Sequence, residues 1–298
     1  MSQIGIVGSG AIAQALGCAL HRRGAPISAV AARNRAHAER AARFIADDVR
    51  AVTYAEVAGL ASHLIVAVSD DAIGVVAEEL VDAGVRSGTV LHTSGAKGPA
   101  ALTPLRTQGV ACGVLHPLQS VPSPELGIAK LEGITYGVGG DRTAVEWAEH
   151  LVRLLNSRAL RVPVDSFPIY HAAATLASNA IPALVDAAVG LMQTAGVDRD
   201  AALEALKPLY LASAENVAAL GPVGALTGPV SRGDAATVQG HLQALEHLGR
   251  TDIAGLYVAI ARCLVGLARR RGLDASEARR LEQLLADAAA MNEIEETA

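Results

Sequence analysis

The stretch IGIVGSGAIAQALG, residues 4–17, decides the fold, because a glycine-rich turn joins a short apolar run to a helical pattern. Within it, GSGAIA (8–13) has the form G-x-G-x-x-A. In such a turn the first glycine permits the tight bend, the second lets the backbone approach a pyrophosphate, and the alanine allows close packing of helix on strand. The amino terminus of the helix adds amide donors and its dipole. We therefore predict a dinucleotide site formed by Gly8, Ser9, Gly10, Ala11, Ile12 and Ala13.

Beyond this turn, short apolar runs alternate with helical patterns as far as Pro163. The predicted strands are 3–8, 26–32, 63–69, 88–95, 111–117, 133–140 and 158–163. The predicted helices are 11–24, 36–45, 71–84 and 144–156. Such alternation is typical of an α/β domain, so residues 1–163 are predicted to form a dinucleotide-binding Rossmann domain with a doubly wound parallel sheet.

After Pro163 the strand patterns stop, and the remaining chain has the pattern of helices punctuated by Gly and Pro. One segment, GPVGALTGPVSRGD (221–234), is too rich in turn residues to be helical. We therefore predict that residues 164–298 form an all-helical domain that binds substrate and forms a homodimer. Its richness in Ala and Leu suits a dimer interface, although a monomeric bundle would have the same pattern.

Composition excludes several classes of function. The 298 residues carry a net charge of −5, without the basic character of nucleic-acid-binding proteins. The three cysteines, Cys18, Cys112 and Cys263, are far apart and in no metal-binding spacing, so no metal site is predicted. The chain has no charged-then-apolar leader, and no apolar run reaches the ~20 residues of a membrane span without a charge or turn. A cytoplasmic protein without membrane or nucleic-acid partners is the expectation.

The residues after the second predicted strand indicate which dinucleotide is bound. NAD enzymes place an acidic residue there, on the ribose 2′-hydroxyl. This chain instead has Arg33, Asn34 and Arg35, with no Asp or Glu nearby. A guanidinium could bind a 2′-phosphate through paired hydrogen bonds, so we predict NADP(H) as the cofactor. The alternative is a solvated loop before a helix.

Several other polar positions follow predicted strands, where a doubly wound sheet faces its ligand. Val68 and Ser69 are predicted to line the path of the dinucleotide, with Asp70 or Asp71 capping the next helix. Ser94 could bind a substrate carboxylate or the nicotinamide amide, or belong to an ordinary turn. His116 precedes Pro117, which favours an extended backbone and a ring at the rim of the crevice, or a structural role.

Two cations could hold a carboxylate substrate. Lys97 lies just beyond the strand that carries Ser94, although an exposed loop lysine is the common case. Arg232 lies in the turn-rich segment LTGPVSRGD (226–234), where it could reach substrate or a partner subunit, or pair with Asp234.

The first helix of the second predicted domain contains YHAAATLASN (170–179). At about 100° of rotation per residue, His171, Thr175 and Ser178 share one face and Asn179 lies on its flank. Four polar groups along an alanine-rich helix could form the wall of an active site, or they could be satisfied contacts inside a bundle.

Together, GSGAIA, VAVSDDAI, LHTSGA, LHPLQS, YHAAATLASN and LTGPVSRGD resemble the Rossmann-like proteins that carry DUF2520, a domain of unknown function. The resemblance spans Ile4 to about Leu285. The group is similar to the wider superfamily of 6-phosphogluconate dehydrogenase, β-hydroxyacid dehydrogenases, ketopantoate reductase and pyrroline-5-carboxylate reductase. The resemblance implies a Rossmann domain followed by a helical domain that often dimerises.

The superfamily also implies a place for the chemistry. Its first long helix in the second domain carries K-x-x-x-N, in which the lysine acts on the reacting oxygen and the asparagine binds substrate. Asn179 matches the asparagine, but Thr175 stands at the lysine position. A threonine hydroxyl is too weak an acid for that role near neutrality, whereas His171, one turn earlier, has an imidazole suited to proton transfer.

Three functions remain open from the sequence. The first is an NADPH-dependent reductase of a small 2-oxo acid, with ketopantoate as the favoured substrate. His171 would donate the proton, and Thr175 and Asn179 would hydrogen-bond the substrate, with Ser94, Lys97, His116 or Arg232 assisting binding. The second is a cyclic imine reductase of the pyrroline-5-carboxylate reductase type, whose protonated substrate needs no strong acid. The third is a non-catalytic NADP-binding sensor.

Overall fold

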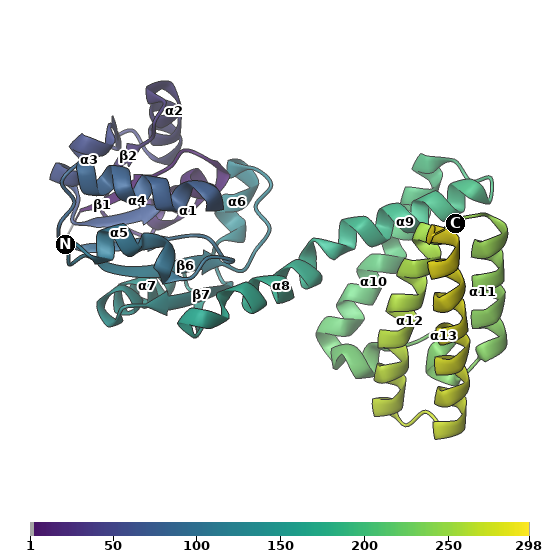
Figure 1. Cartoon of the computed structure of the whole chain (residues 1–298). Helices are drawn as coiled ribbons and strands as arrows, with labels where there is room; N and C mark the ends of the chain where they lie inside the picture. Colours follow the sequence, from purple (N-terminus) through teal and green to yellow (C-terminus); the bar gives the residue numbers. More distant parts are fainter. Residues whose placement is uncertain (1–2, 298) are drawn as a thin grey trace. The chain divides into compact units, whose positions relative to one another are not determined.

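The computed structural model describes residues 3–297 and divides the chain into two compact units between Ile181 and Pro182. The first unit combines a sheet with helices, and the described part of the second is entirely helical (Figure 1). This arrangement confirms the predicted fold class, an α/β Rossmann domain followed by helices.

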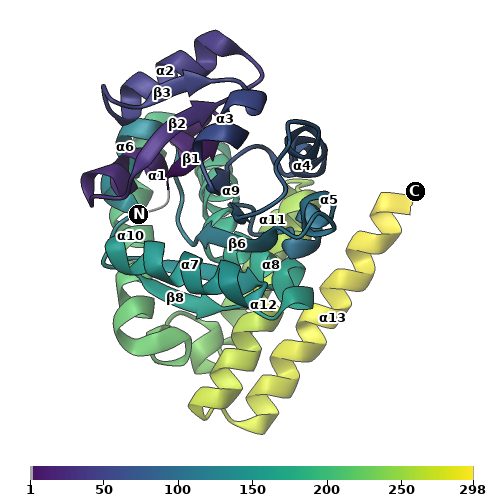
Figure 2. The same cartoon turned by 90° about the vertical axis from the view of Figure 1, so that its left-hand side faces the viewer.

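The first unit contains an eight-stranded sheet in the order β3-β2-β1-β4-β5-β6-β7-β8, whose β3–β2–β1 side can be followed in Figure 2. The strands are β1 (Ile4–Val7), β2 (Ile27–Ala31), β3 (Arg50–Val52), β4 (His63–Val66), β5 (Thr89–His92), β6 (Ala111–Pro117), β7 (Thr135–Gly140) and β8 (Arg158–Arg161). All neighbouring strands are parallel except β6 and β7. The sheet is therefore mostly parallel rather than fully parallel as predicted.

Helices cover both faces of this sheet, as the doubly wound prediction requires. They are α1 (Ala11–Arg22), α2 (Arg35–Ile45), α3 (Tyr54–Leu60), α4 (Ile73–Asp82), α5 (Thr103–Arg106), α6 (Pro124–Lys130) and α7 (Arg142–Leu154). One apolar layer contains Leu16 of α1 and Leu151 of α7, and the other contains Ile73 and Leu80 of α4. Because helices cover both faces, the central strands are apolar throughout: β1, IGIV, is buried at every position.

Helix α8 (Phe167–Ser178) belongs to the first unit, since Phe167 and Tyr170 pack with Val114 and Val162. The predicted domain boundary after Pro163 rests on the point where the strand patterns end in the sequence, and it stays a prediction. The division into compact units comes later because α8 packs with the end of the sheet.

The second unit contains α9 (Ala180–Thr194), α10 (Arg199–Ala225), α11 (Ala235–His247), α12 (Thr251–Arg271) and α13 (Ala275–Thr297), where α9 begins just before the division. Its core joins Val238 of α11, Val265 of α12 and Leu281 of α13. The prediction that 221–234 is not helical is wrong for its first part. Gly221 kinks the chain (φ 71°, ψ 167°), but helical backbone resumes and continues to Ala225.

Two helical stretches among the described residues are long and apolar enough to cross a membrane by length and composition alone, Val164–Thr194 and Thr251–Arg271. In the second stretch, Val258, Ala261 and Val265 pack in the core of the helical unit, as expected for a core helix. The first stretch is largely exposed within the single chain.

Candidate functional site

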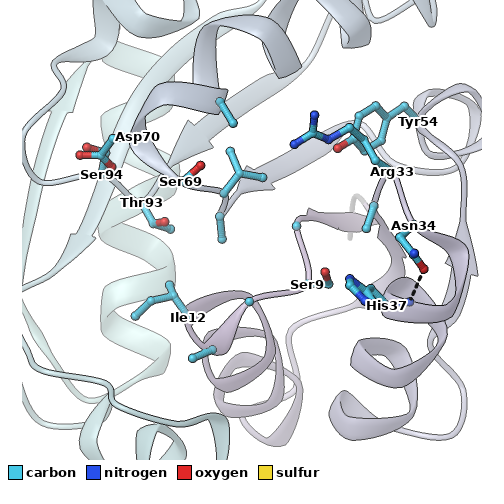
Figure 3. Close-up of a pocket in the computed structure, with 17 residues that line it drawn as sticks. Ser9, Ile12, Arg33, Asn34, His37, Tyr54, Ser69, Asp70, Thr93 and Ser94 are labelled. Atoms are coloured by element: carbon cyan, nitrogen blue, oxygen red, sulfur yellow. Dashed lines mark hydrogen bonds between the residues drawn. The ribbon is translucent and has the colours of Figure 1, made fainter.

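A cavity of about 600 Å³ lies at the glycine-rich turn between β1 and α1. We call it the turn cavity. It is lined by Gly8–Ile12, Ala32–Asn34, His37, Tyr54, Ala67–Asp70, Ala72, Thr93 and Ser94. Figure 3 shows that Ser9 and Ile12 lie near the β1–α1 turn, whereas Ser69, Asp70, Thr93 and Ser94 approach from the neighbouring strand ends. The cavity thus lies along the carboxyl ends of the strands, where open α/β sheets bind ligands.

The turn itself has the geometry that a pyrophosphate needs. Gly8 has φ +123°, and a Cβ there would lie 2.2 Å from the carbonyl oxygen of Ala67. At Gly10, by contrast, no atom lies within 4 Å of an added Cβ, so the backbone borders open space. Helix α1 begins at Ala11 without a side-chain cap. Its first amides therefore remain available to an anion, and Ala13 is buried against the sheet.

The structure separates the roles of Arg33, Asn34 and Arg35. Arg33 lines the turn cavity, with its guanidinium beside Tyr54 (Figure 3). The Asn34 side chain caps α2 by accepting a hydrogen bond from the His37 amide at 3.1 Å. Arg35 does not line the cavity and forms an exposed ion pair with Glu39 at 3.2 Å. Of the two predicted arginines, the geometry therefore favours Arg33 for a 2′-phosphate.

The residues after β4 lie where the sequence placed them. Val68 and Ser69 both line the turn cavity. The expectation that Asp70 or Asp71 caps the following helix is wrong, because neither the first turn nor α4 has a side-chain cap. Asp70 instead lies on the wall of the cavity.

The loop after β5 is organised by His92, which is fully buried. Its Nδ1 accepts a hydrogen bond from the Ser94 amide at 3.2 Å, and its Nε2–H donates to the Gly98 carbonyl at 3.1 Å. Burial lowers the pKa of His92 to about 4, which keeps this tautomer neutral. The Ser94 hydroxyl accepts from the Lys97 amide at 3.1 Å and still has its proton to donate into the turn cavity. Lys97 itself is exposed.

A second cavity, of about 730 Å³, follows helix α8. We call it the α8 cavity. Its polar wall contains His116, Gln119, Ser120, Tyr170, His171, Thr175, Ser178 and Asn179. Its apolar wall contains Leu118, Leu160, Ala173, Ala174 and Ala177. The cavity therefore gathers the predicted residues of α8 together with His116 from β6.

Two histidines face each other in this cavity. The rings of His116 and His171 have their centroids 5.9 Å apart, nearly edge to face. Burial, and secondarily a positive charge on His171, lower the pKa of His116 to about 4. His116 is therefore neutral at neutral pH, and the half-buried His171 lies beside it in the same cavity.

The remaining predicted residues of α8 lie along the same cavity. Thr175 and Asn179 are exposed within the single chain. The Ser178 hydroxyl lies 2.8 Å from the Ala174 carbonyl and 2.8 Å from Asn179 Oδ1. The Asn179 side-chain NH₂ remains free to donate to a ligand, because this contact occupies only its oxygen.

Arg232 lies in the second unit, where it is the exposed last residue of a short 3₁₀ turn, Val230–Arg232. Asp234 does not form an ion pair with it and instead caps α11 by accepting from the Thr237 amide at 3.0 Å. This loop is therefore held by a helix cap rather than by the Arg–Asp pair that the sequence left open.

Sequence reasoning missed several polar residues that line these cavities, among them His37, Tyr54 and Tyr170. Tyr170 could have been found from the sequence, because it directly precedes the predicted site residue His171. Tyr54 gave no signal, because it enters the turn cavity from α3, a short helix that the sequence pattern did not predict.

Two consecutive residues of the first unit connect the two cavities. Ser94 lines the turn cavity, and the next residue, Gly95, lies against the His116 ring that lines the α8 cavity. A Cβ on Gly95 would come within 2.6 Å of His116 Nε2. Only a residue without a side chain can pack so closely on the His116 ring.

Comparison with solved structures supports the fold. The chain is similar to protein TM1727 from Thermotoga maritima, with 22% identity and a TM-score of 0.70 over 90% of this chain and 98% of that one. It is also similar to BF3122 from Bacteroides fragilis, named as a candidate NADP oxidoreductase, with 23% identity and a TM-score of 0.68 over 88% and 97%. A reductive aminase from Aspergillus terreus, solved with NADPH and ethyl levulinate, has 18% identity and a TM-score of 0.60 over 98% and 94%. At these identities the likeness concerns the fold.

Comparison with protein families shows which domains the two parts of the chain match. No curated protein matches the chain. The Rossmann-like domain family matches residues 1–117, and the family described as the domain of unknown function DUF2520 matches residues 134–263. The two matches follow one another in the order that the sequence motifs indicated. The chain therefore contains a match to a Rossmann-like domain, followed by a match to the DUF2520 domain.

Proposed function

We propose that this protein is an NADP(H)-dependent oxidoreductase that reduces a small 2-oxo acid, with ketopantoate as the favoured substrate. One observation carries the proposal: Ser94 lines the cavity built on a dinucleotide-binding turn, and the next residue, Gly95, packs on the ring of His116, which lines the cavity of His171 and Asn179. A cofactor in the first cavity and a carbonyl substrate in the second would be neighbours.

The residues of the turn cavity fit the cofactor. The open space beside Gly10 and the uncapped start of α1 suit a pyrophosphate, and Arg33 suits a 2′-phosphate. When bound, NADPH supplies a hydride from its nicotinamide ring. The Ser94 hydroxyl is placed to orient the nicotinamide amide or a substrate carboxylate.

The α8 cavity supplies the proton and the orientation. His171 donates the proton to the substrate oxygen, from one turn before Thr175, the position where the superfamily has a lysine. Asn179 and Thr175 hydrogen-bond the same oxygen or a neighbouring hydroxyl, and Lys97 assists with the carboxylate. The alanines of α8 leave an apolar wall against which a small aliphatic acid fits.

The test measures consumption of NADPH with ketopantoate. We expect turnover, and we expect His171→Ala to lower kcat by about 10²- to 10⁴-fold, the usual contribution of a positioned acid, with NADPH still bound. His247→Ala is the matched control, since that histidine is exposed at the end of α11 and lines neither cavity. Unchanged turnover in His171→Ala would remove His171 from the role of acid.

A second candidate is reduction of a cyclic imine. It is favoured by Thr175, whose hydroxyl cannot replace a lysine as an acid, because an imine substrate arrives already protonated. Rates across a panel of 2-oxo acids and cyclic imines separate the two candidates. Tight NADPH binding with no turnover of any of them would instead favour a non-catalytic sensor.

The assembly that we propose is a cytoplasmic homodimer formed through the helical domain. Helices α9 and α10 expose several large apolar side chains within the single chain: Ile181, Leu184, Leu203, Leu209, Leu211, Val217 and Leu220. A monomer rarely leaves so many large apolar side chains of two neighbouring helices in water, and burial between two copies removes them from it.

A further inference from the structure

The described structure contains a hydrogen bond in the α8 cavity whose direction determines the chemistry of His116. The hydroxyl of Tyr170 lies 2.9 Å from His116 Nδ1, and the two rings are nearly perpendicular, with centroids 5.5 Å apart. Two arrangements fit this distance. Either the hydroxyl donates and Nδ1 accepts, or Nδ1–H donates and the hydroxyl accepts.

The surroundings favour donation by the tyrosine. Among the described residues, His116 Nδ1 is the one acceptor within hydrogen-bond distance of the Tyr170 hydroxyl, whose oxygen also receives a hydrogen bond from the Gly137 backbone. If Nδ1–H donated instead, the half-buried O–H would have no acceptor in the protein, which costs free energy. Burial raises the pKa of Tyr170, so its proton stays in place. The imidazole is neutral, so it carries a single N–H, and Nδ1 is then the bare nitrogen.

His92 offers an internal precedent for this tautomer. Its Nδ1 also accepts a hydrogen bond, from the Ser94 amide, and its Nε2–H donates to a carbonyl. His116 differs in one respect: no protein acceptor is recorded for its Nε2 among the described residues. Its Nε2–H is therefore available to a ligand.

Two glycines make room for the pair. A Cβ on Gly137 of β7 would lie 2.5 Å from the Tyr170 hydroxyl, and a Cβ on Gly95 would lie 2.6 Å from His116 Nε2. Gly137 is paired with His116 across β6 and β7, so the space that it leaves for the Tyr170 hydroxyl lies beside His116. Any larger residue at either position would displace one of the two rings and with it the hydrogen bond.

We propose that Tyr170 holds His116 as its Nε2–H tautomer, so that His116 presents a fixed neutral hydrogen-bond donor to the oxygen of a substrate in the α8 cavity. Tyr170 is then a positioning residue that acts through His116. The role of His116 as a donor rests on the proposed function, whereas the tautomer does not. His171 remains the group that transfers a proton, and His116 polarises or orients the oxygen that receives it.

The tautomer is tested directly by long-range ¹H–¹⁵N correlation spectra of the full protein labelled with ¹⁵N-histidine. His116→Asn identifies the signals by their loss. We expect wild-type His116 at pH 7 to show a protonated Nε2 and an unprotonated Nδ1, and Tyr170→Phe to show a mixture of both tautomers. A protonated Nδ1 in the wild type, a doubly protonated ring, or an unchanged pattern in Tyr170→Phe would overturn the proposal.

The same variant is tested for turnover of NADPH with ketopantoate. Tyr170→Phe is expected to lower kcat about tenfold, the usual value of one hydrogen bond, with the KM for NADPH unchanged. Tyr257→Phe is the matched control, because it removes an equivalent bond of 2.9 Å to His241 Nδ1, between α11 and α12. It should leave both the His116 spectrum and kcat as in the wild type.

The two measurements separate the two proposals. The expected spectra in a protein that turns over no substrate would contradict the proposed reductase and retain the tautomer. Normal turnover with unaltered kcat in Tyr170→Phe would contradict the positioning role alone.

Discussion

Arg33 and Arg35 stand on either side of Asn34, the residue that caps α2. The two arginine side chains therefore lie in different environments on either side of the cap. Arg33 precedes it and extends along the turn cavity, whereas Arg35 is the first residue of the helix and pairs with Glu39 one turn on. A single position along the chain thus separates a candidate phosphate ligand from a surface ion pair.

This difference predicts cofactor preference. Arg33→Ala should raise the KM for NADPH by about 10- to 100-fold, because a charge-assisted hydrogen bond contributes roughly 1.5–3 kcal/mol. The KM for NADH should change little, since NADH has no 2′-phosphate. Steady-state kinetics with both cofactors measures the effect.

Arg35→Ala is the control, because its exposed ion pair contributes little and does not line the cavity. Equal losses with NADPH and NADH in Arg33→Ala, or a larger loss in Arg35→Ala, would contradict recognition of the 2′-phosphate by Arg33.

At the residue scale, the sequence predicted positions better than roles. The spacing of Gly8 and Gly10 could be interpreted directly, because backbone conformation follows from the absence of a side chain. The hydrogen bond from the Ser94 amide to His92 could not be predicted in this way, since it depends on how the loop closes on itself. The contact of Tyr170 with His116 was missed for the same reason, because the two residues are 54 positions apart in the sequence.

At the scale of elements, the β1–α1 turn combines two glycines with opposite requirements. Gly8 needs its positive φ to fold, whereas Gly10 borders empty space and has no need of glycine in the free protein. The motif therefore divides into a position that serves folding and one that serves the ligand.

Alanine substitutions should reveal this division. Gly10→Ala should leave the melting temperature nearly unchanged but weaken NADPH binding, because its methyl group occupies space that the pyrophosphate needs. Gly8→Ala should lower the melting temperature, since it forces a Cβ against the Ala67 carbonyl at a strained φ. Thermal unfolding and NADPH titration of both variants make the comparison. Equal effects of the two substitutions on stability would contradict it.

Among the elements, those with a strong hydrophobic period were predictable and those shaped by packing were not. The strand 63–69 and the helix 144–156 correspond to β4 and α7. The strand β3 comprises only Arg50–Val52, which is too short to show an alternation of apolar and polar residues. The helices α3 and α6 were missed because they too are short. The reversal of β7 is also invisible in the sequence, because strand direction depends on the path of the intervening chain.

At the scale of the whole molecule, helix α10 is hard to explain as part of a monomer. Of its 27 residues, all within the described part of the chain, only Ala202 is buried. Its side chains Leu209 and Leu220 are 64% and 62% exposed. Such a helix has little tertiary packing to stabilise it in a single chain, although packing supplies most helical stability in proteins. The sequence indicated a possible interface through its Ala and Leu content, but only the structure identifies which side chains remain uncovered.

The homodimer is tested by introducing a charge on that helix. Leu209→Glu should convert the dimer to a monomer, because it places a carboxylate in an interface that would otherwise gain roughly 1.5–3 kcal/mol from each buried leucine. Val75→Glu is the matched control, since Val75 is 51% exposed on α4 of the first unit. Sedimentation equilibrium of the wild type and both variants at micromolar concentration measures the mass. A monomeric wild type would contradict the dimer, and a dimeric Leu209→Glu would place the interface away from the centre of α10.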